Sequence, residues 1–465
     1  MTRIAIVGGG PAGYEAALVA ASLGAEVTLI EADGVGGACV LFDCVPSKTL
    51  IAISDKVTAY RDSPALGVGT DVDVRVDLDA VNHRIKTLAT AQSTDIHRRL
   101  VREGVTVLTG RGRFAAVQTG RAYRIEVLDG AGAVADEVVA DVVLLATGAV
   151  PRELAGSPSD GERILSWRQL YDLTELPAHL VVIGSGVTGA EFASGYSELG
   201  VPVTLVSSRD RVLPGEDADA ADVIERVFTE RGGTLVKQAR ASAVTRTDDG
   251  VVVELTDGRT VSGSHALICV GSVPNTSGLG LEHIGLELDD RGYVGVDRVS
   301  RTNVSGVYAA GDCTGVLLLA SVAAMQGRIA MWHALGEAVT PLRVKTVAAN
   351  VFTHPEIATV GIGTSGVDVT VRPRTVTLPL AGNARAKMSR QTEGFVRLYC
   401  REETGVVIGG VIVAPDASEL ILPVALAVQR RLTVDDLAST FTVYPSLSGS
   451  VTEAARRLMH HTDLD

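Results

Sequence analysis

Residues 3–31 read RIAIVGGGPAGYEAALVAASLGAEVTLIE, and this stretch decides the fold. A short β-branched run leads into GGGPAG, then into a helical pattern, and then into a second strand, which is the order of a βαβ unit. Gly8, Gly10 and Gly13 fill the three glycine positions of a GxGxxG motif, and Glu31 ends the second strand. Such glycines let the backbone approach a pyrophosphate at a helix N-terminus, while the acid accepts a ribose hydroxyl. The stretch predicts a dinucleotide site; the alternative is a glycine-rich turn in another doubly wound fold.

The same pattern returns in the second quarter of the chain. Residues 180–206 read LVVIGSGVTGAEFASGYSELGVPVTLV, with Gly184, Gly186 and Gly189 at the glycine positions. Two dinucleotide sites imply two nucleotides, and a chain that holds two can pass a hydride between them. The sequence therefore predicts an α/β oxidoreductase with two Rossmann-like domains.

A pair of cysteines follows the first unit, in GGACVLFDCVPSK at residues 36–48. On a regular helix, residues spaced like Cys39 and Cys44 have Cα atoms roughly 8–9 Å apart, whereas a disulfide tolerates only about 4.4–6.8 Å. Either the segment is bent or the thiols stay free. Pro46 disfavours helix at Val45 and makes an irregular helix start plausible. A helix N-terminus would also lower the thiol pKa values. Taken alone, the pair fits two buried inert cysteines better than a redox couple.

Composition limits the possible partners and surroundings. The chain has 465 residues, enough for two or three domains, and a net charge of −13 that argues against nucleic acid as a partner. No secretory signal and no run of 18 apolar residues is visible, so we expect no membrane span and a cytoplasmic protein. In that reducing compartment a disulfide is more often catalytic than structural. The remaining cysteines have apolar contexts and no CxxC pair occurs, so we expect packing roles and no metal site.

The whole chain resembles the flavoprotein disulfide reductases, the family of dihydrolipoamide dehydrogenase, glutathione reductase and mercuric reductase. The motifs that carry the resemblance occur in the family's order along the sequence: GGGPAG with Glu31, CVLFDCVPSK, ATG at 146–148, GSGVTGAE, GSVPN at 271–275, YAAGDC at 308–313 and VFTHPEIATVG at 351–361. The resemblance implies an FAD-binding domain at 1–150 and 271–344, an NAD(P)-binding domain at 151–270 and an α+β dimerisation domain at 345–465. It also implies a homodimer.

The resemblance further implies roles for individual residues. Cys44 is expected beside the flavin and Cys39 to exchange with substrate, while Lys48 is expected near the flavin N5 edge, paired with Glu191. A cation there would stabilise the negative charge of reduced flavin; the alternative is an ordinary surface ion pair. The implied FAD contacts are Gly8, Gly10, Pro11, Ala12, Gly13, Glu31, Gly37, Lys48, Gly110, Gly112, Thr147, Gly148, Gly271, Gly311, Asp312, Leu319 and Ala320. The implied NADPH or NADH contacts are Gly184, Gly186, Gly189, Ser207 and Arg209.

The sequence departs from the family near its C-terminus. Disulfide-reducing members carry a His-Pro-Thr-x-x-Glu phrase, supplied across the dimer, in which the histidine moves the substrate thiol's proton. Here the stretch is YPSLSG at 444–449, so Tyr444 replaces the histidine and Gly449 the glutamate. A phenol has a pKa of about 10 and moves protons poorly at neutral pH, where an imidazole near 6.5 is well matched. His460 and His461 are close along the chain, but we expect a solvated tail there.

Two further departures concern the flavin and the coenzyme. In LASVAAMQG at 319–327, Ser321 and Gln326 stand where the family has a histidine and a glutamate, which lowers the charge near the flavin and suits an uncharged acceptor such as a quinone, although drift explains it as well. In VTLVSSRDR at 203–211, Ser207 occupies the position of the acid typical of NADH sites and arginines follow it. Hydroxyl and guanidinium groups suit a 2′-phosphate, so we expect NADPH to be accepted, with or without NADH; the alternative is two solvent-exposed arginines.

These observations predict an FAD enzyme that takes hydride from NAD(P)H and passes electrons to a quinone-type acceptor, with Cys39, Cys44, Lys48, Glu191 and Tyr444 as the candidate catalytic residues. The resemblance is strongest to lipoamide-dehydrogenase-like quinone reductases of actinobacteria. The alternatives are a dihydrolipoamide dehydrogenase or other disulfide reductase that uses Cys39 and Cys44, a transhydrogenase, and a flavin-bearing binding subunit of a larger complex.

Overall fold

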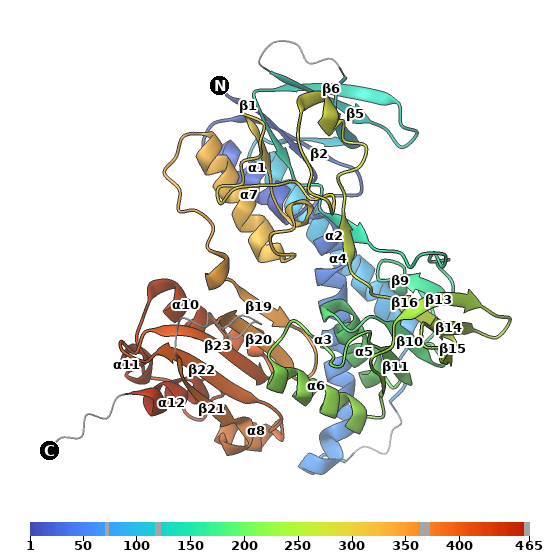
Figure 1. Ribbon diagram of the computed structural model, residues 1–465, viewed down its shortest axis with the longest axis vertical. Coiled ribbons are helices and arrows are strands. Elements are labelled where there is room, and N and C mark those ends of the chain that lie inside the picture. Colours follow the sequence, from blue (N-terminus) through green and yellow to red (C-terminus); the bar gives the residue numbers. More distant parts are fainter. Residues whose placement is uncertain (70–73, 117–121, 363–372, 460–465) are drawn as a thin grey trace.

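The computed structural model describes residues 1–69, 74–116, 122–362 and 373–459, arranged as three units that are each built on a β-sheet (Figure 1). The first unit lies at the top of the view, the second at the lower right and the C-terminal unit at the lower left. Leu29, Leu205 and Ile412 represent the apolar cores of the three units and are at most 2% exposed. The core of the second unit continues into the C-terminal sheet, where it includes Val411 and Val413. The predicted fold class, two Rossmann-like α/β units followed by an α+β unit, is confirmed.

The first unit is a doubly wound parallel sheet. Its strands are short and mostly buried, as expected for strands covered on both faces. Helix α1 (Pro11–Ser22) follows the first strand, with Pro11 in its first turn, and packs against α7 (Ala320–Ala334). The sheet has the order β18 (Val307–Ala309), β7 (Val142–Leu145), β1 (Arg3–Val7), β2 (Glu26–Glu31) and β3 (Thr106–Thr109). An antiparallel sheet joins it, made of β4 (Arg111–Phe114), β5 (Tyr123–Leu128) and β6 (Val134–Ala140).

The second unit repeats this plan. Helix α5 (Val187–Glu198) follows its central strand as α1 follows β1, and α6 (Ala218–Glu230) comes after the next strand. Its parallel sheet has the order β12 (Thr234–Val236), β11 (Val203–Val206), β10 (Leu180–Ile183), β16 (His265–Ile268) and β9 (Ile164–Ser166). A three-stranded antiparallel sheet contains β13 (Ala241–Arg246), β14 (Val251–Leu255) and β15 (Thr260–Gly263). The pair β8 (Ala149–Pro151) and β17 (Ser272–Pro274) lies where the chain leaves the first unit and returns.

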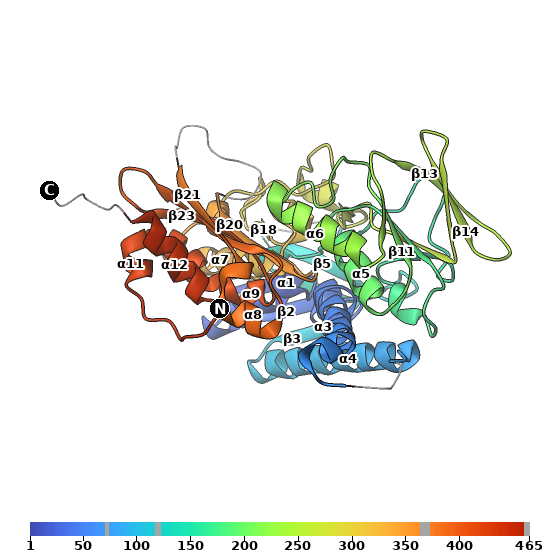
Figure 2. The same cartoon turned by 90° about the horizontal axis from the view of Figure 1, so that it is seen from below.

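The C-terminal unit is an antiparallel sheet with helices. Figure 2 shows α11 and α12 at one end of the molecule and strands β13 and β14 of the second unit at the other. The sheet has the order β19 (Ala348–Val351), β20 (Glu356–Gly361), β23 (Val407–Ala414), β22 (Phe395–Arg401) and β21 (Pro373–Pro379). The helices are α8 (Ala384–Ser389), α9 (Ala417–Leu420), α10 (Leu422–Arg430), α11 (Val434–Ala438) and α12 (Gly449–Leu458).

Two consecutive helices connect the first unit to the other two. Helix α2 (Gly37–Leu41) is followed by α3 (Cys44–Asp62), which runs down between the second and C-terminal units, as Figure 1 shows. α3 packs against α5 and against α4 (Leu78–Arg102). By length and composition alone, the helical stretch Gly37–Leu66 could cross a membrane, but a core helix meets the same criterion. Lys48 of this stretch is ion-paired with the buried Glu191 of α5.

Candidate active site

The glycine-rich turn after β1 brings two backbone segments closer than any side chain would allow. Gly8 has φ +104°, and a Cβ there would lie 2.2 Å from the carbonyl oxygen of Ala146. A Cβ on Gly13 would lie 1.8 Å from the carbonyl oxygen of Gly8, so the helix sits directly on the strand. A Cβ on Gly10, at the start of α1, would meet nothing within 4 Å. The turn therefore leaves open space at a helix N-terminus, as an incoming pyrophosphate requires.

Glu31 closes the same turn from the end of β2. Its carboxylate accepts the backbone N–H of Gly9 at 2.5 Å and that of Asp33 at 2.8 Å. These bonds hold the carboxylate beside the glycines. Glu31 therefore lies where the sequence placed it, at the rim of a cavity that extends along α1.

This cavity, of about 350 Å³, collects most of the predicted FAD contacts. It is lined by both cysteines of the pair, Cys39 and Cys44, and by Gly8, Gly10, Pro11, Ala12, Glu31, Gly37, Gly110, Gly112, Thr147, Gly148, Gly311, Asp312 and Ala320. Four predicted contacts do not line it: Gly13, which packs under the turn, Lys48, Gly271 and Leu319. For the last two, the neighbours Ser272 and Leu318 line the cavity instead.

Several lining residues were not foreseen from the sequence. Arg111 and Arg113 flank the predicted Gly112, and Arg168 lies over the ring of Phe42 at 4.0 Å and bonds Asp33 at 3.1 Å. Asp43 also lines the cavity, between the two cysteines in sequence. Only Asp43 and the two arginines beside Gly112 had a signal in the sequence, which was their position next to residues already singled out.

The two cysteines sit on either side of a helix break. Cys39 belongs to α2 and Cys44 begins α3, and Phe42 and Asp43 between them leave helical geometry at φ −136° and −123°. The expected irregular start of the helix is confirmed. Both thiols are free, and they share a hydrogen bond. The break brings the two side chains together, which a regular helix cannot do.

The expected low pKa is wrong for Cys44. The hydrogen bond with Cys39 raises the pKa of the Cys44 thiol most, and burial and the charge of Asp43 raise it further. Lys48 opposes these effects without reversing them. The position at the start of α3 is outweighed because losing a proton costs Cys44 its bond to Cys39 and places a second negative charge near Asp43.

Lys48 and Glu191 form the predicted pair. The Lys48 Nζ lies 2.7 Å from a carboxylate oxygen of Glu191, whose other oxygen accepts the backbone N–H of Phe352 at 2.9 Å. Burial lowers the pKa of Lys48, but Glu191 and Asp43 outweigh it, and the net pKa is raised. The pair thus connects α3, α5 and the C-terminal unit, and it keeps a protonated lysine one helical turn after Cys44.

Asp312 and Gln326 shape the far side of the cavity. Burial, together with the charge of Asp43, raises the pKa of Asp312 to about 6. Gln326 accepts the backbone N–H of Gly311 at 2.9 Å and is buried. A neutral amide therefore holds the turn that carries Asp312 without adding charge to the cavity.

The second glycine turn has nearly the same backbone angle and the same close backbone contacts as the first. Gly184 has φ +107°, and a Cβ there would lie 2.2 Å from the carbonyl oxygen of Cys269. A Cβ on Gly189 would lie 1.8 Å from the carbonyl oxygen of Gly184. A Cβ on Gly186, where α5 begins, would meet nothing within 4 Å. The second unit has the same opening for a pyrophosphate as the first.

The ends of the second strands differ. Ser207 is 0% exposed, and its hydroxyl bonds the hydroxyl of Ser185 at 2.7 Å and accepts the backbone N–H of Arg209 at 3.1 Å. Arg209 itself is exposed, whereas Arg211 is ion-paired with Asp222 at 3.2 Å. Ser207 thus shapes the turn from inside, and Arg209 is the cation of this turn that faces solvent.

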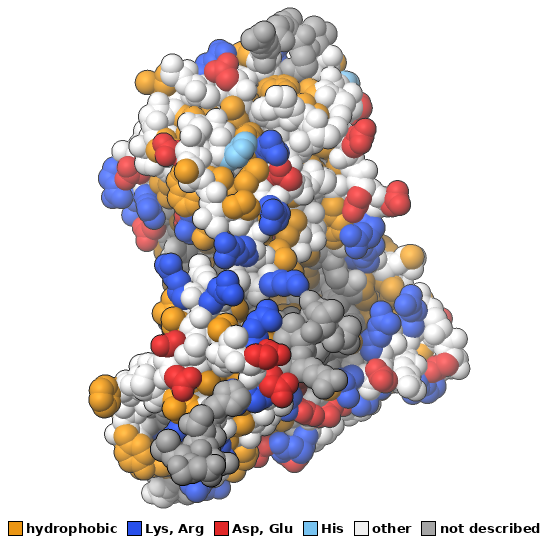
Figure 3. Space-filling model, turned by 60° about the vertical axis from the view of Figure 1, so that its left-hand side comes forward, with side chains coloured by type: hydrophobic (Ala, Val, Ile, Leu, Met, Phe, Trp, Pro, Cys, Tyr) orange, Lys and Arg blue, Asp and Glu red, His pale blue; other side chains and the backbone are white. Residues whose placement is uncertain are grey.

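Tyr444 does not line this cavity; it lies in the segment between α11 and α12. Its side chain is 86% exposed, and Phe441 and Val443 beside it are also exposed. Figure 3 shows hydrophobic side chains over the lower part of one face, where the C-terminal unit lies. His460 and His461 lie outside the described residues.

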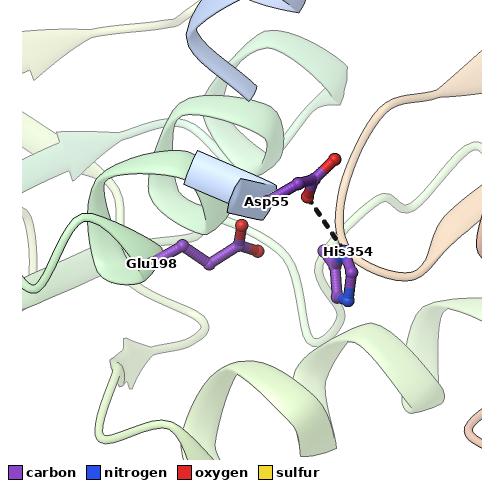
Figure 4. A group of neighbouring side chains, drawn as sticks. All are labelled: Asp55, Glu198 and His354. Carbon is purple, nitrogen blue, oxygen red and sulfur yellow. Dashed lines mark hydrogen bonds and ion pairs between the residues drawn. The ribbon is translucent and has the colours of Figure 1, made fainter. Parts of the chain in front are cut away.

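A second cluster of titratable side chains joins the three units below the active site. Asp55 of α3, Glu198 of α5 and His354 before β20 point toward one another (Figure 4). His354 Nδ1 lies 2.9 Å from Asp55, and Arg231 bonds Glu198 at 2.9 Å. These residue types can bind a metal ion, but here Glu198 is ion-paired with Arg231 and Asp55 is bonded to His354. The cluster fits a structural junction.

Comparisons with known proteins agree with this geometry. Residues 2–327 match the family described as pyridine nucleotide-disulphide oxidoreductase, and residues 347–455 match its dimerisation domain. A Mycobacterium tuberculosis protein named NAD(P)H dehydrogenase (quinone) is 62% identical, covering 100% of this chain and 95% of that protein. Dihydrolipoyl dehydrogenase of Haloferax volcanii is 33% identical, over 98% and 96%.

Solved structures give the same result. The crystal structure of LpdA from Mycobacterium tuberculosis has a TM-score of 0.94 at 61% identity, covering 99% of this chain and 100% of that one. The flavoprotein disulfide reductase RclA from Escherichia coli has a TM-score of 0.84 at 24% identity, covering 98% and 99%, and supports the fold alone. The chain belongs to the pyridine nucleotide-disulphide oxidoreductase family.

Proposed function

We propose that this chain is a homodimeric FAD-dependent oxidoreductase that takes hydride from NAD(P)H and delivers electrons to a quinone-type acceptor. The proposal is carried by the presence of cavity groups suited to electron transfer together with the absence of an acid/base dyad for dithiol chemistry. The cavity side has a dithiol and the Lys48–Glu191 pair, while the C-terminal stretch has Tyr444 and Gly449 in place of an acid/base dyad. The 62% identical relative named NAD(P)H dehydrogenase (quinone) supports the same acceptor class.

The residues present fit FAD. The open space above Gly10 at the N-terminus of α1 suits a pyrophosphate, and the Glu31 carboxylate at its rim suits a ribose hydroxyl. When bound, the flavin would supply the chemistry of accepting hydride and passing electrons onward. The cavity reaches both cysteines and Asp312, so the dithiol and the flavin would share one space.

The second unit fits a nicotinamide coenzyme. The opening at Gly186 mirrors that at Gly10, and the exposed Arg209 offers charge-assisted hydrogen bonds to a 2′-phosphate. Ser207 assists by fixing the turn that carries Arg209. We infer that NADPH is used, with NADH accepted less well.

We assign Lys48 to the reacting end of the flavin because it lies one helical turn after Cys44, which lines the cavity, although Lys48 itself does not. Glu191 holds the ammonium group at 2.7 Å, and Phe352 fixes Glu191 through its backbone N–H. A protonated lysine placed in this way would stabilise negative charge that develops nearby during electron transfer. Asp312 would hold the ribityl or pyrophosphate region from the opposite side.

The C-terminal unit supports the proposed homodimer. This unit matches the family's dimerisation domain and exposes Phe441, Val443 and Tyr444 together. Exposed apolar side chains of this kind mark protein interfaces. We assign residues 1–150 and 271–344 to FAD binding, 151–270 to NAD(P) binding and 345–465 to dimerisation, in a cytoplasmic enzyme.

The second candidate is a disulfide reductase, which the hydrogen-bonded Cys39 and Cys44 favour. Steady-state oxidation of NADPH and NADH, with a naphthoquinone in one assay and lipoamide in the other, separates the two candidates. We expect fast quinone turnover with lipoamide near background. Rapid lipoamide turnover would contradict the proposal, because it would mean that Tyr444 does not disable dithiol chemistry.

A further inference from the structure

Asp43 is a charged residue of the cavity that the proposed function leaves without a role. It stands at the break between α2 and α3, where its backbone N–H donates to Ala38 at 2.8 Å and its carbonyl accepts from Ser47 at 2.7 Å. An aspartate in front of a helix usually caps it with its side chain. The Asp43 carboxylate makes no such bond and lines the cavity beside Cys39 and Cys44.

This carboxylate also has no dedicated cation. In the part of the chain that the structure describes, no hydrogen bond or ion pair joins the Asp43 side chain to a partner. Lys48 is the cation whose charge acts on it, but the Lys48 Nζ is bonded to Glu191. Burial raises the pKa of Asp43, because a half-buried negative charge without its own partner is costly, and the charge of Lys48 opposes this effect. When ionised, this carboxylate adds a negative charge to the cavity that both cysteines line.

The other charged and titratable groups around Asp43 do not neutralise it. Its charge interacts with Cys44 and Lys48 of α3, with Glu191 of α5, and with Tyr171, Cys269 and Asp312. Among these groups only Lys48 is a cation. Arg168 lies over the neighbouring Phe42, but it is ion-paired with Asp33. The thiol end of the cavity therefore has an excess of negative charge.

We propose that Asp43 is a positioning residue that holds Cys44 in its thiol form and so keeps the dithiol out of the electron path. Reaction of a dithiol with an external disulfide begins when a thiolate attacks one sulfur, forming a mixed disulfide and releasing the other sulfur as a thiolate. Cys39, the thiol expected to exchange with substrate, would form this mixed disulfide, and Cys44 must then lose its proton to attack the Cys39 sulfur and release the substrate as a second thiol. The charge of Asp43 opposes that loss, and no imidazole stands at position 444 to take the proton.

This inference rests on the proposed function for its consequence, namely that electrons bypass the cysteines. The effect of Asp43 on the ionisation of the Cys44 thiol can be measured without any electron acceptor, because it is a property of the reduced protein. The rate of alkylation by iodoacetamide follows the thiolate fraction, so its pH profile gives the pKa of the thiol.

The experiment uses the full-length FAD-loaded protein with Cys39→Ser, so that Cys44 is the reactive thiol of this segment; Cys269, Cys313 and Cys400 are buried. Alkylation of Cys44 is followed by mass spectrometry from pH 6 to 10. Adding Asp43→Asn should lower the pKa of Cys44 by about one unit, so that alkylation at pH 7.5 becomes about tenfold faster. Asp43→Glu, which restores the charge, should return the rate close to that of the parent.

Asp33→Asn is the matched control, because Asp33 lines the same cavity but is ion-paired with Arg168. It should leave the pH profile unchanged. Asp43→Ser removes the same charge with a smaller side chain and repeats the test if Asp43→Asn does not fold. Unchanged alkylation in both Asp43 variants, or an equal increase in Asp33→Asn, would overturn the inference. Absence of quinone turnover in the enzyme without any substitution would instead overturn only the proposed function.

Discussion

The two glycine-rich units differ at a single place that matters for their ligands. Their turns are near copies: Gly8 and Gly184 have φ +104° and +107°, and the same 2.2 Å contact would meet a Cβ on either. The first unit has Glu31 at the end of β2, and the second has Ser207 directly after β11. Glu31 bonds two backbone N–H groups and stays at the rim of its cavity, whereas Ser207 is buried under its turn.

This difference separates two properties of a dinucleotide site. The glycines fix the backbone and the space for a pyrophosphate, which every dinucleotide has. The residue at the end of the second strand, together with the residues that follow it, sets the charge offered to the ribose. A carboxylate suits free hydroxyls, and a hydroxyl followed by an exposed arginine suits a 2′-phosphate.

The largest effect on nucleotide binding should come from replacing the first glycine of either turn by alanine. Gly8→Ala and Gly184→Ala each place a Cβ against a backbone carbonyl, a clash that costs about 1–3 kcal/mol or more. We expect Gly8→Ala to weaken FAD binding at least about tenfold, measured as flavin absorbance per chain. Gly184→Ala should keep its flavin and raise the KM for NADPH. Loss of flavin from both variants to the same extent would contradict the assignment of separate nucleotides.

Giving the second unit the acid of the first should exchange its coenzyme preference. Ser207→Glu introduces a carboxylate close to the expected 2′-phosphate, and the repulsion between two neighbouring negative charges costs about 1–2 kcal/mol. The KM for NADPH should rise about tenfold, and that for NADH should stay equal or fall. Ser207→Gln, of the same size without the charge, is the control. An equal rise for both coenzymes in Ser207→Glu would indicate a steric effect only.

Removing the exposed cation should have a smaller effect in the same direction. Arg209→Gln should raise the KM for NADPH about fivefold, because an exposed ion pair contributes up to about 1 kcal/mol. The KM for NADH should change less than about twofold. Arg211→Gln is the matched control, since Arg211 is paired with Asp222. Equal effects of both substitutions would contradict the assignment of Arg209 as the residue that contacts the 2′-phosphate.

The smallest effect is expected at the cluster of Asp55, Glu198 and His354, which joins the three units. Burial lowers the pKa of His354, but the hydrogen bond to Asp55 and the charge of Glu198 outweigh it, so the folded pKa is raised. The stabilisation is therefore fully present below the unfolded pKa of about 6.5 and is lost as the pH rises through the folded value. His354→Gln should lower the free energy of unfolding by about 0.5–1 kcal/mol at pH 6, and less at pH 9. A difference that grows with pH would contradict this account.

Most of the fold could be predicted from the sequence because its signals are local. Glycine turns, strand patterns and the acid at position 31 follow one another along the chain, and the structure has each in place. The Lys48–Glu191 contact spans 143 residues and was predictable only through the family resemblance.

The remaining site features depend on distant packing. The pKa of Cys44 was predicted with the wrong direction because its position at a helix start is a local signal, while the thiol of Cys39 and the carboxylate of Asp43 act through space. Ser207 was expected to offer a hydroxyl to a phosphate. Its burial depends on Ser185, which comes close only when the strands pair.

The central claim is that electrons reach the acceptor without the cysteines. The most direct test is the turnover of NADPH with a naphthoquinone by the Cys39→Ser variant, compared with the unaltered enzyme at equal flavin content. The account predicts that the variant keeps more than about half of the quinone turnover, since a planar acceptor needs only the flavin. Loss of nearly all quinone turnover in this variant would show that Cys39 and Cys44 lie in the electron path and would contradict the account.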